Sequence, residues 1–139
     1  MQISARNQIT GIVESITRSK INAQIAIKLK SGNIITSVIT NSATENLNLK
    51  IGDEVIALFK SSTVLISTDT NLNISARNQL FGTIINLIID EVNSEIIIDI
   101  GNEDKIATVI TTSSVRNLNL QVGSNVNVII KSSDIMIGK

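Results

Sequence analysis

The amino-acid sequence predicts an all-β protein with short helices, built as two tandem five-stranded barrels. The chain repeats itself, because 25 of the 66 residues in 3–68 are identical to residues in 74–139 at a constant offset of 71. Its composition is rich in β-branched residues, and Phe59 and Phe81 are its only aromatic residues, which favours strands. Residues 21–30 alternate between apolar and polar side chains, as in a strand with one buried face.

The repeat divides the chain into two modules of similar length. We expect the first module at 1–68 and the second at 74–139, joined by a polar linker at 69–73 that has no strand pattern. Modules of this size lie near the lower limit for an independent hydrophobic core. We therefore expect the modules to depend on partners for part of their stability.

The sequence of each copy predicts three strands, a short helix and two more strands. This order is typical of a Greek-key barrel of the OB type. Gly11 and Gly82 lie early in the first strands and predict a bulge or bend there. Ser42 and Glu45 fit a capping box for the helix, and Arg116 replaces the glutamate in the second copy, which predicts a weaker cap. The expected strands are 8–17, 21–30, 34–40, 54–60 and 63–67, then 79–88, 105–111, 125–131 and 134–138.

The composition argues against an enzyme. There is no His, Cys or Tyr, so the usual general bases, nucleophiles and metal ligands are missing. None of the twelve acidic residues recurs at an equivalent position in both copies. The adjacent carboxylates at 90–91 and 103–104 occur in one copy only and are interpreted as solvated turns. We expect no catalytic residues and no cofactor.

The composition also argues against nucleic-acid and membrane partners. Single-stranded nucleic acid is usually bound by a basic groove with aromatic stacking platforms, whereas this chain has zero net charge and two Phe. The first residues lack the pattern of a signal peptide, and no apolar run approaches the ~18–20 residues that cross a bilayer. The sequence therefore predicts a cytoplasmic protein without a nucleic-acid or membrane partner.

Two cations stand at equivalent positions in both copies. Of the twelve Lys and Arg residues, only Arg6 with Arg77 and Lys60 with Lys131 recur. Ser and Asn donors flank each of them, so each cluster could form half of a cradle for a doubly charged tetrahedral anion. The alternative is that both segments are turns whose Arg and Lys lie over apolar surface.

Several segments together resemble the molybdenum-pterin-binding (Mop) family, also called molbindins. These are Ser-Ala-Arg-Asn-Gln before the first strand, the Asn at 22 and 93, Val-Ile-Thr-x-Ser before the helix, and Lys-Ser-Ser after the fourth strand. The resemblance covers both copies and nearly the whole chain. The protein therefore resembles a tandem di-Mop molbindin, with two Mop modules in one chain. It implies OB-like modules that bind molybdate or tungstate between modules for intracellular storage or buffering. It also implies a homotrimer of six modules.

The resemblance assigns oxyanion binding to specific positions, with the metal held as its oxyanion and not coordinated directly. The Lys-Ser segment is expected to meet the Arg of a neighbouring module. The implied oxyanion-binding residues are Ser4, Ala5 through its amide, Arg6, Asn7, Lys60 and Ser61, with Ser75, Ala76, Arg77, Asn78, Lys131 and Ser132 in the second copy.

A second, axial kind of site connects loosely with Asn22 and Ala23, and with Asn93 and Ser94. The family commonly has Gly-Ala-Val-Asn-Ala here, whereas this chain has Ser-Lys-Ile-Asn-Ala at 19–23 and Asp-Glu-Val-Asn-Ser at 90–94. The acidic pair at 90–91 would repel a dianion. Two other functions stay open at this point: a regulatory or structural oligomeric module, and a nucleic-acid-binding OB domain.

Overall fold

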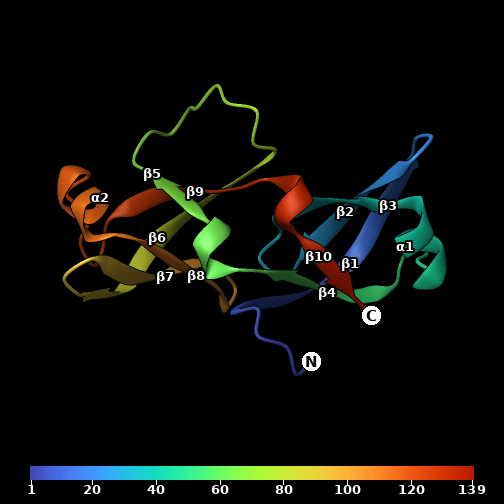
Figure 1. The fold of residues 1–139 in the computed structure, drawn as a ribbon, viewed down its shortest axis with the longest axis horizontal. Coiled ribbons are helices and arrows are strands. Elements are labelled where there is room, and N and C mark those ends of the chain that lie inside the picture. Colours follow the sequence, from blue (N-terminus) through green and yellow to red (C-terminus); the bar gives the residue numbers. More distant parts are fainter.

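The computed structural model describes residues 1–139 and contains two five-stranded antiparallel sheets, each curled into a barrel (Figure 1). This confirms the expected all-β class with two OB-like modules. No helix is both long enough and apolar enough to cross a bilayer. The first copy contains β1 (Asn7–Arg18), β2 (Asn22–Leu29), β3 (Ile34–Thr40), α1 (Asn41–Asn46), β4 (Glu54–Phe59), η1 (Ser61–Thr63) and β5 (Leu65–Ser67). The second copy contains β6 (Asn78–Ile89), β7 (Asn93–Gly101), β8 (Asp104–Thr111), α2 (Thr112–Asn117), β9 (Asn125–Ile130), η2 (Ser132–Asp134) and β10 (Met136–Gly138).

The two copies exchange their last strands. The first sheet has the order β10-β4-β1-β2-β3, and the second has the order β5-β9-β6-β7-β8. Met136 of β10 lies opposite Leu58 of β4, and Leu65 of β5 lies opposite Ile129 of β9. Figure 1 shows the red β10 beside β4 and the green β5 beside β9. The boundaries at 68 and 74 therefore separate the two sequence copies, whereas each barrel takes its fifth strand from the other copy.

The alternation of apolar and polar residues in the sequence corresponds to alternating buried and exposed side chains in the strands. In β2 the residues Ala23, Ile25, Ile27 and Leu29 are buried, and the residues between them are at least partly exposed. One cluster of 24 buried apolar side chains includes residues of both copies. The two barrels consequently share a continuous core.

The glycines of the first strands have a different role from the one expected. The register of β1 shifts between Val13 and Ser15, and that of β6 shifts between Ile84 and Asn86, so the irregularities follow the glycines instead of including them. A Cβ on Gly82 would lie 2.6 Å from the carbonyl oxygen of Asp99 in the neighbouring strand. Gly11 and Gly82 are therefore required by the close approach of a neighbouring backbone.

The expected capping box at Ser42 is wrong. Helix α1 is capped by Thr40, whose Oγ1 accepts a hydrogen bond from the Ala43 N–H at 3.0 Å. In α2 the equivalent Thr111 accepts from the Ser114 N–H at 3.1 Å. Both copies thus have the same threonine cap, because the chain is still extended at this residue and turns helical only after it. The exchange of Glu45 for Arg116 does not involve the cap.

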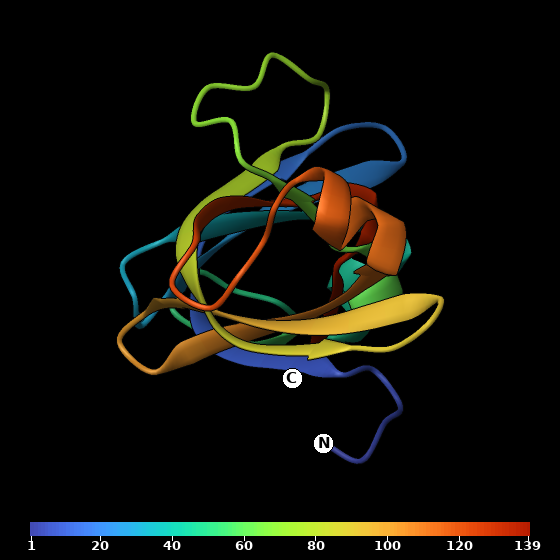
Figure 2. The same cartoon turned by 90° about the vertical axis from the view of Figure 1, so that its left-hand side faces the viewer.

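Hydrogen bonds between the copies follow the same pseudo-symmetric plan as the strand exchange. Ser37 Oγ donates to the Ile135 carbonyl at 2.5 Å, and the equivalent Thr108 Oγ1 donates to the Val64 carbonyl at 2.7 Å. These bonds fix the crossing segments η1 and η2 to the third strand of the opposite copy. Seen from the end, the N-terminal segment and the linker after β5 project from opposite sides of the paired barrels (Figure 2).

Candidate functional site

The strand register brings the recurring Arg and Lys of each copy to the same end of a sheet. Asn7 of β1 lies opposite Phe59 of β4 as the last pair of the ladder, and Arg6 and Lys60 are the residues directly next to this pair in the chain. In the second copy Asn78 lies opposite Ile130, which places Arg77 and Lys131 in the same way. The two recurring cations of each copy therefore lie at the same end of its first and fourth strands. The expected meeting of Lys with the Arg of a neighbouring module stays a prediction.

The Arg6 cluster lies at the junction between the copies. The Arg6 guanidinium forms an ion pair with Glu95 of β7. The Ser61 carbonyl accepts from Thr108 Oγ1 of β8 at 3.4 Å. Arg6 and Ser61, both predicted for oxyanion binding, thus contact two neighbouring strands of the opposite copy, Arg6 contacting β7 and Ser61 contacting β8.

The Arg77 cluster repeats this arrangement with one chemical difference. Arg77 Nη1 donates to Gln24 Oε1 of β2 at 3.3 Å, and Gln24 is the residue equivalent to Glu95. The side chains of Lys60 and Lys131 take part in none of the three ion pairs of the structure. Both lysines and both arginines are exposed, as are Ser4 and Ser75, whereas Ser61 and Ser132 are half-buried.

The ion pair changes the protonation behaviour of both partners. The hydrogen bond and the attraction of the Arg6 guanidinium lower the pKa of Glu95 below its ordinary value, against a smaller opposing effect of burial. The same contact raises the pKa of Arg6. Both groups are therefore charged at neutral pH.

The predicted asparagines bridge the two copies. Asn7 Nδ2 donates to the Ala107 carbonyl at 2.9 Å, and Asn7 Oδ1 accepts from the Ala107 N–H at 2.8 Å. Asn78 makes the equivalent pair of bonds to Thr36. Ala5 is buried beside Asn7, and Ala76 is half-buried. The structure thus gives both asparagines a bridging role, and their contact with an oxyanion stays a prediction.

The residues of the second predicted site line two hollows at equivalent positions. Gln24 and Glu95, the partners of the two arginines, also line them, so each hollow adjoins the Arg of the opposite copy. The first hollow, of about 310 Å³, is lined by Thr17, Arg18, Ser19, Asn22, Ala23, Gln24 and Val38. The second, of about 220 Å³, is lined by Ile88, Asp90, Asn93, Ser94, Glu95 and Val109. Sequence reasoning missed positions 24 and 95 because the residue type differs between the copies.

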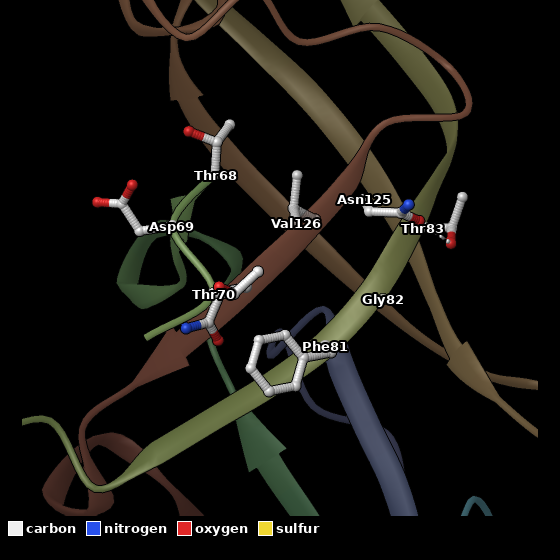
Figure 3. A pocket seen from close by; sticks show the side chains of 9 residues that line it. Thr68, Asp69, Thr70, Phe81, Gly82, Thr83, Asn125 and Val126 are labelled. Carbon is white, nitrogen blue, oxygen red and sulfur yellow. Dashed lines mark hydrogen bonds between the residues drawn. The ribbon is translucent and has the colours of Figure 1, made fainter. Parts of the chain in front are cut away.

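A third hollow, of about 280 Å³, lies where the chain after β5 passes over the outer face of β6 and β9 (Figure 3). Figure 3 shows Thr68 and Thr70 on one side and Phe81 and Asn125 on the other. None of the predicted oxyanion-binding residues lines it. It is therefore separate from the candidate site.

A family match and two relatives point to the same protein family. Residues 3–66 and 74–137 each match the TOBE domain. The chain is 37% identical over 137 residues to the molybdenum transport protein ModE of Azotobacter vinelandii, an alignment that covers 99% of this chain and 51% of that protein. It is 34% identical over 138 residues to the molybdenum-pterin-binding protein MopA of Rhodobacter capsulatus, covering 99% and 52%. The chain thus spans about half the length of these two relatives.

A solved structure has the same fold over its full length. The structure of a cytoplasmic molybdate-binding protein ModG with molybdate bound superposes with a TM-score of 0.95 at 33% sequence identity, and the match covers 99% of both chains. Two TOBE domains account for nearly all of this chain, and the Rhodobacter capsulatus relative is named a molybdenum-pterin-binding protein. The chain therefore belongs to the TOBE domain family and is a tandem of two Mop domains, a di-Mop molbindin.

Proposed function

We propose that this protein binds molybdate or tungstate in the cytoplasm and stores or buffers it. The observation that carries the proposal is the recurrence of one Arg and one Lys in both copies, each next to the last residue pair of the ladder between the first and fourth strands. The similarity to a cytoplasmic protein whose structure was solved with molybdate bound supports it. Binding, and not turnover, is the proposed activity.

The donor set suits a tetrahedral dianion. One recurring Arg and one recurring Lys, the Lys proposed to come from a neighbouring module, supply two positive charges, and the Arg fork can donate two parallel hydrogen bonds to neighbouring oxygens. The hydroxyls of Ser4 and Ser61 and the amide of Ala5 are the proposed remaining donors. The same set is proposed for Ser75, Ala76, Arg77, Lys131 and Ser132. The metal is bound through its oxygens, so no Cys or His ligand is needed.

We further propose that three chains assemble around a common axis. Exposed apolar side chains recur at equivalent positions, such as Ile21 and Val92 with 74% and 72% of their surface exposed, and Ile51 and Val122 with 68% and 62%. Burial of such surface contributes about 25 cal/mol per Å². A homotrimer of six modules is the closed arrangement proposed here. Light scattering after size exclusion measures it, and a monomer that binds molybdate at full stoichiometry would contradict it.

Titration calorimetry with molybdate tests the binding site. We expect Arg6→Ala or Arg77→Ala to weaken the affected class of sites by roughly 2–5 kcal/mol, because an anion then loses its charged partner. Ser61→Ala should cost less, about 1.5–3 kcal/mol, because it removes one hydrogen bond to a charged group. Lys28→Ala, at a lysine that does not recur, is the matched control and should have no effect. Unchanged stoichiometry and affinity in both Arg variants would show that the site is misassigned.

A further inference from the structure

Glu95 and Gln24 make the two otherwise equivalent clusters different. Each is the residue of the opposite copy that contacts the recurring arginine, Glu95 at Arg6 and Gln24 at Arg77. The remaining candidate ligands are the same residue types in both clusters. The only charge difference at the arginine contact is therefore the carboxylate at position 95.

We propose that the residue that contacts each recurring arginine determines the order in which the two sites bind oxyanion. The Arg77 site binds first and more tightly, and Glu95 weakens binding at the Arg6 site. This rests on the proposed function. With one lysine at each site, Glu95 lowers the summed charge around Arg6 to +1, whereas Arg77 and its lysine keep a sum of +2 beside the neutral Gln24. A dianion at the Arg6 site must compete for a guanidinium that already has an anionic partner.

The contact at Arg6 is placed so that it can open. The Arg6 side chain is 49% exposed and that of Glu95 is 31% exposed. Exposed ion pairs contribute little to stability, so breaking this one does not require unfolding of the junction. At the Arg77 site, an oxyanion displaces only the neutral oxygen of Gln24, which lies 3.3 Å from Nη1.

The surroundings of the two positions do not cancel the charge difference. In the sheets, Gln24 lies between Thr17 and Val38, and Glu95 lies between Ile88 and Val109, all of them neutral. The hollows lined by the two residues differ in charge in the same sense, the hollow of Gln24 being the more positive. The hollow of Gln24 contains Arg18, whereas the hollow of Glu95 contains Asp90. Asp90 thus adds to the negative charge of Glu95, and the two sheet partners of Glu95 do not oppose it.

The reciprocal variants Glu95→Gln and Gln24→Glu, made in the full chain and titrated with molybdate by calorimetry, test the proposal. We expect two classes of site in the wild type, with the tighter class removed by Arg77→Ala. Glu95→Gln should tighten the weaker class about tenfold or more, since one carboxylate repels a dianion at ~6 Å by that factor even at the dielectric constant of water. Gln24→Glu should weaken the tighter class by a similar factor. In a chain that carries both Glu95→Gln and Gln24→Glu, the tighter class of sites should be removed by Arg6→Ala instead of Arg77→Ala.

Glu54→Gln is the matched control, because Glu54 begins β4 at the end far from Lys60 and takes part in none of the ion pairs. It should leave both classes unchanged, and the effect of Glu95→Gln should shrink at high ionic strength. Circular dichroism and light scattering establish that each variant keeps the fold and assembly of the wild type. If molybdate binds to all sites but Glu95→Gln changes neither class, the proposal is overturned while the proposed function stands. If neither the wild type nor Glu95→Gln binds molybdate, both are overturned.

Discussion

Asn78 and Thr36 are joined by two hydrogen bonds that imitate the pairing of neighbouring strands. Asn78 Oδ1 accepts from the Thr36 N–H at 2.7 Å, and Asn78 Nδ2 donates to the Thr36 carbonyl at 2.8 Å. Both residues are buried, at 3% and 7% exposure. Asn7 and Ala107 form the equivalent pair. One side-chain amide in each copy thus closes the edge of the third strand in the other copy, and the position directly after each recurring Arg is held in place by it.

Asn78→Ala should lower the free energy of unfolding by about 2–4 kcal/mol. The substitution removes two hydrogen bonds and leaves the Thr36 N–H and carbonyl buried without these partners. Urea denaturation followed by far-UV circular dichroism measures the loss, since the chain has no Trp or Tyr for fluorescence. Asn71→Ala, at an exposed linker position, is the control and should change stability by less than about 0.5 kcal/mol. Equal stability of Asn78→Ala and the wild type would refute the bridging role.

Cysteine pairs can test the strand exchange on a background that has no native Cys. Leu58→Cys with Met136→Cys should form a disulfide under mild oxidation, because these residues are register partners in β4 and β10. Leu58→Cys with Leu65→Cys is the matched control, since Leu65 is equivalent to Met136 and would take its place only without exchange. Non-reducing electrophoresis should show a link within one chain for the first pair and none for the second. The opposite result would mean that each barrel keeps its own fifth strand.

Gly82→Ala should destabilise the protein by about 1–3 kcal/mol, the range for insertion of a methyl group into a packed site. The new Cβ would approach the Asp99 carbonyl oxygen to 2.6 Å, and backbone atoms cannot move aside as a flexible side chain can. Gly11→Ala should behave similarly, because its Cβ would lie 2.8 Å from the Lys28 carbonyl oxygen. Thermal denaturation compares both with Ser62→Ala, an exposed control. A melting temperature unchanged in both glycine variants would contradict the close backbone approach.

The ion pair between Asp53 and Lys139 should make stability depend on pH in the acidic range. Lys139 Nζ lies 3.0 Å from Asp53 Oδ2 and, together with the Lys50 N–H, holds the pKa of Asp53 below its ordinary value. A lowered pKa in the folded state gives stability above the unfolded value of about 3.9, which is lost as pH falls through the folded value. Asp53→Asn should therefore lower the melting temperature at pH 7, and the difference should vanish at pH 2.

Ser124 supplies the matched control for this experiment. It is equivalent to Asp53, and its Oγ accepts from the Gln121 N–H at 3.1 Å without an ion pair. Ser124→Ala should shift the melting temperature by an amount that does not change between pH 7 and pH 2. If Asp53→Asn is equally destabilising at both values, the carboxylate charge is not responsible.

The order of strands and the short α-helix of each copy follow from the amino-acid sequence alone, because they depend on short-range patterns; the 3-10 helices η1 and η2 were not expected. The alternation in residues 21–30 appears as the buried and exposed faces of β2, and the second copy repeats it in β7. The recurrence of Arg6 with Arg77 and of Lys60 with Lys131 singled out cations that lie at the same end of the first and fourth strands. A comparison of the chain with itself was sufficient for this.

The partners of these strands became known from the three-dimensional fold and not from the sequence patterns. Residues 65–67 and 136–138 have the same short apolar pattern, so either could pair with β4, and no local signal distinguishes the two sheets. The contacts that distinguish them, such as those of Asn78 with Thr36 and of Glu95 with Arg6, join residues 42 and 89 positions apart. The glycines and the helix caps differed from expectation for the same reason: their roles depend on where a neighbouring backbone lies and where an extended strand ends. Local patterns select a strand, whereas its neighbour is selected by the packing of the whole molecule.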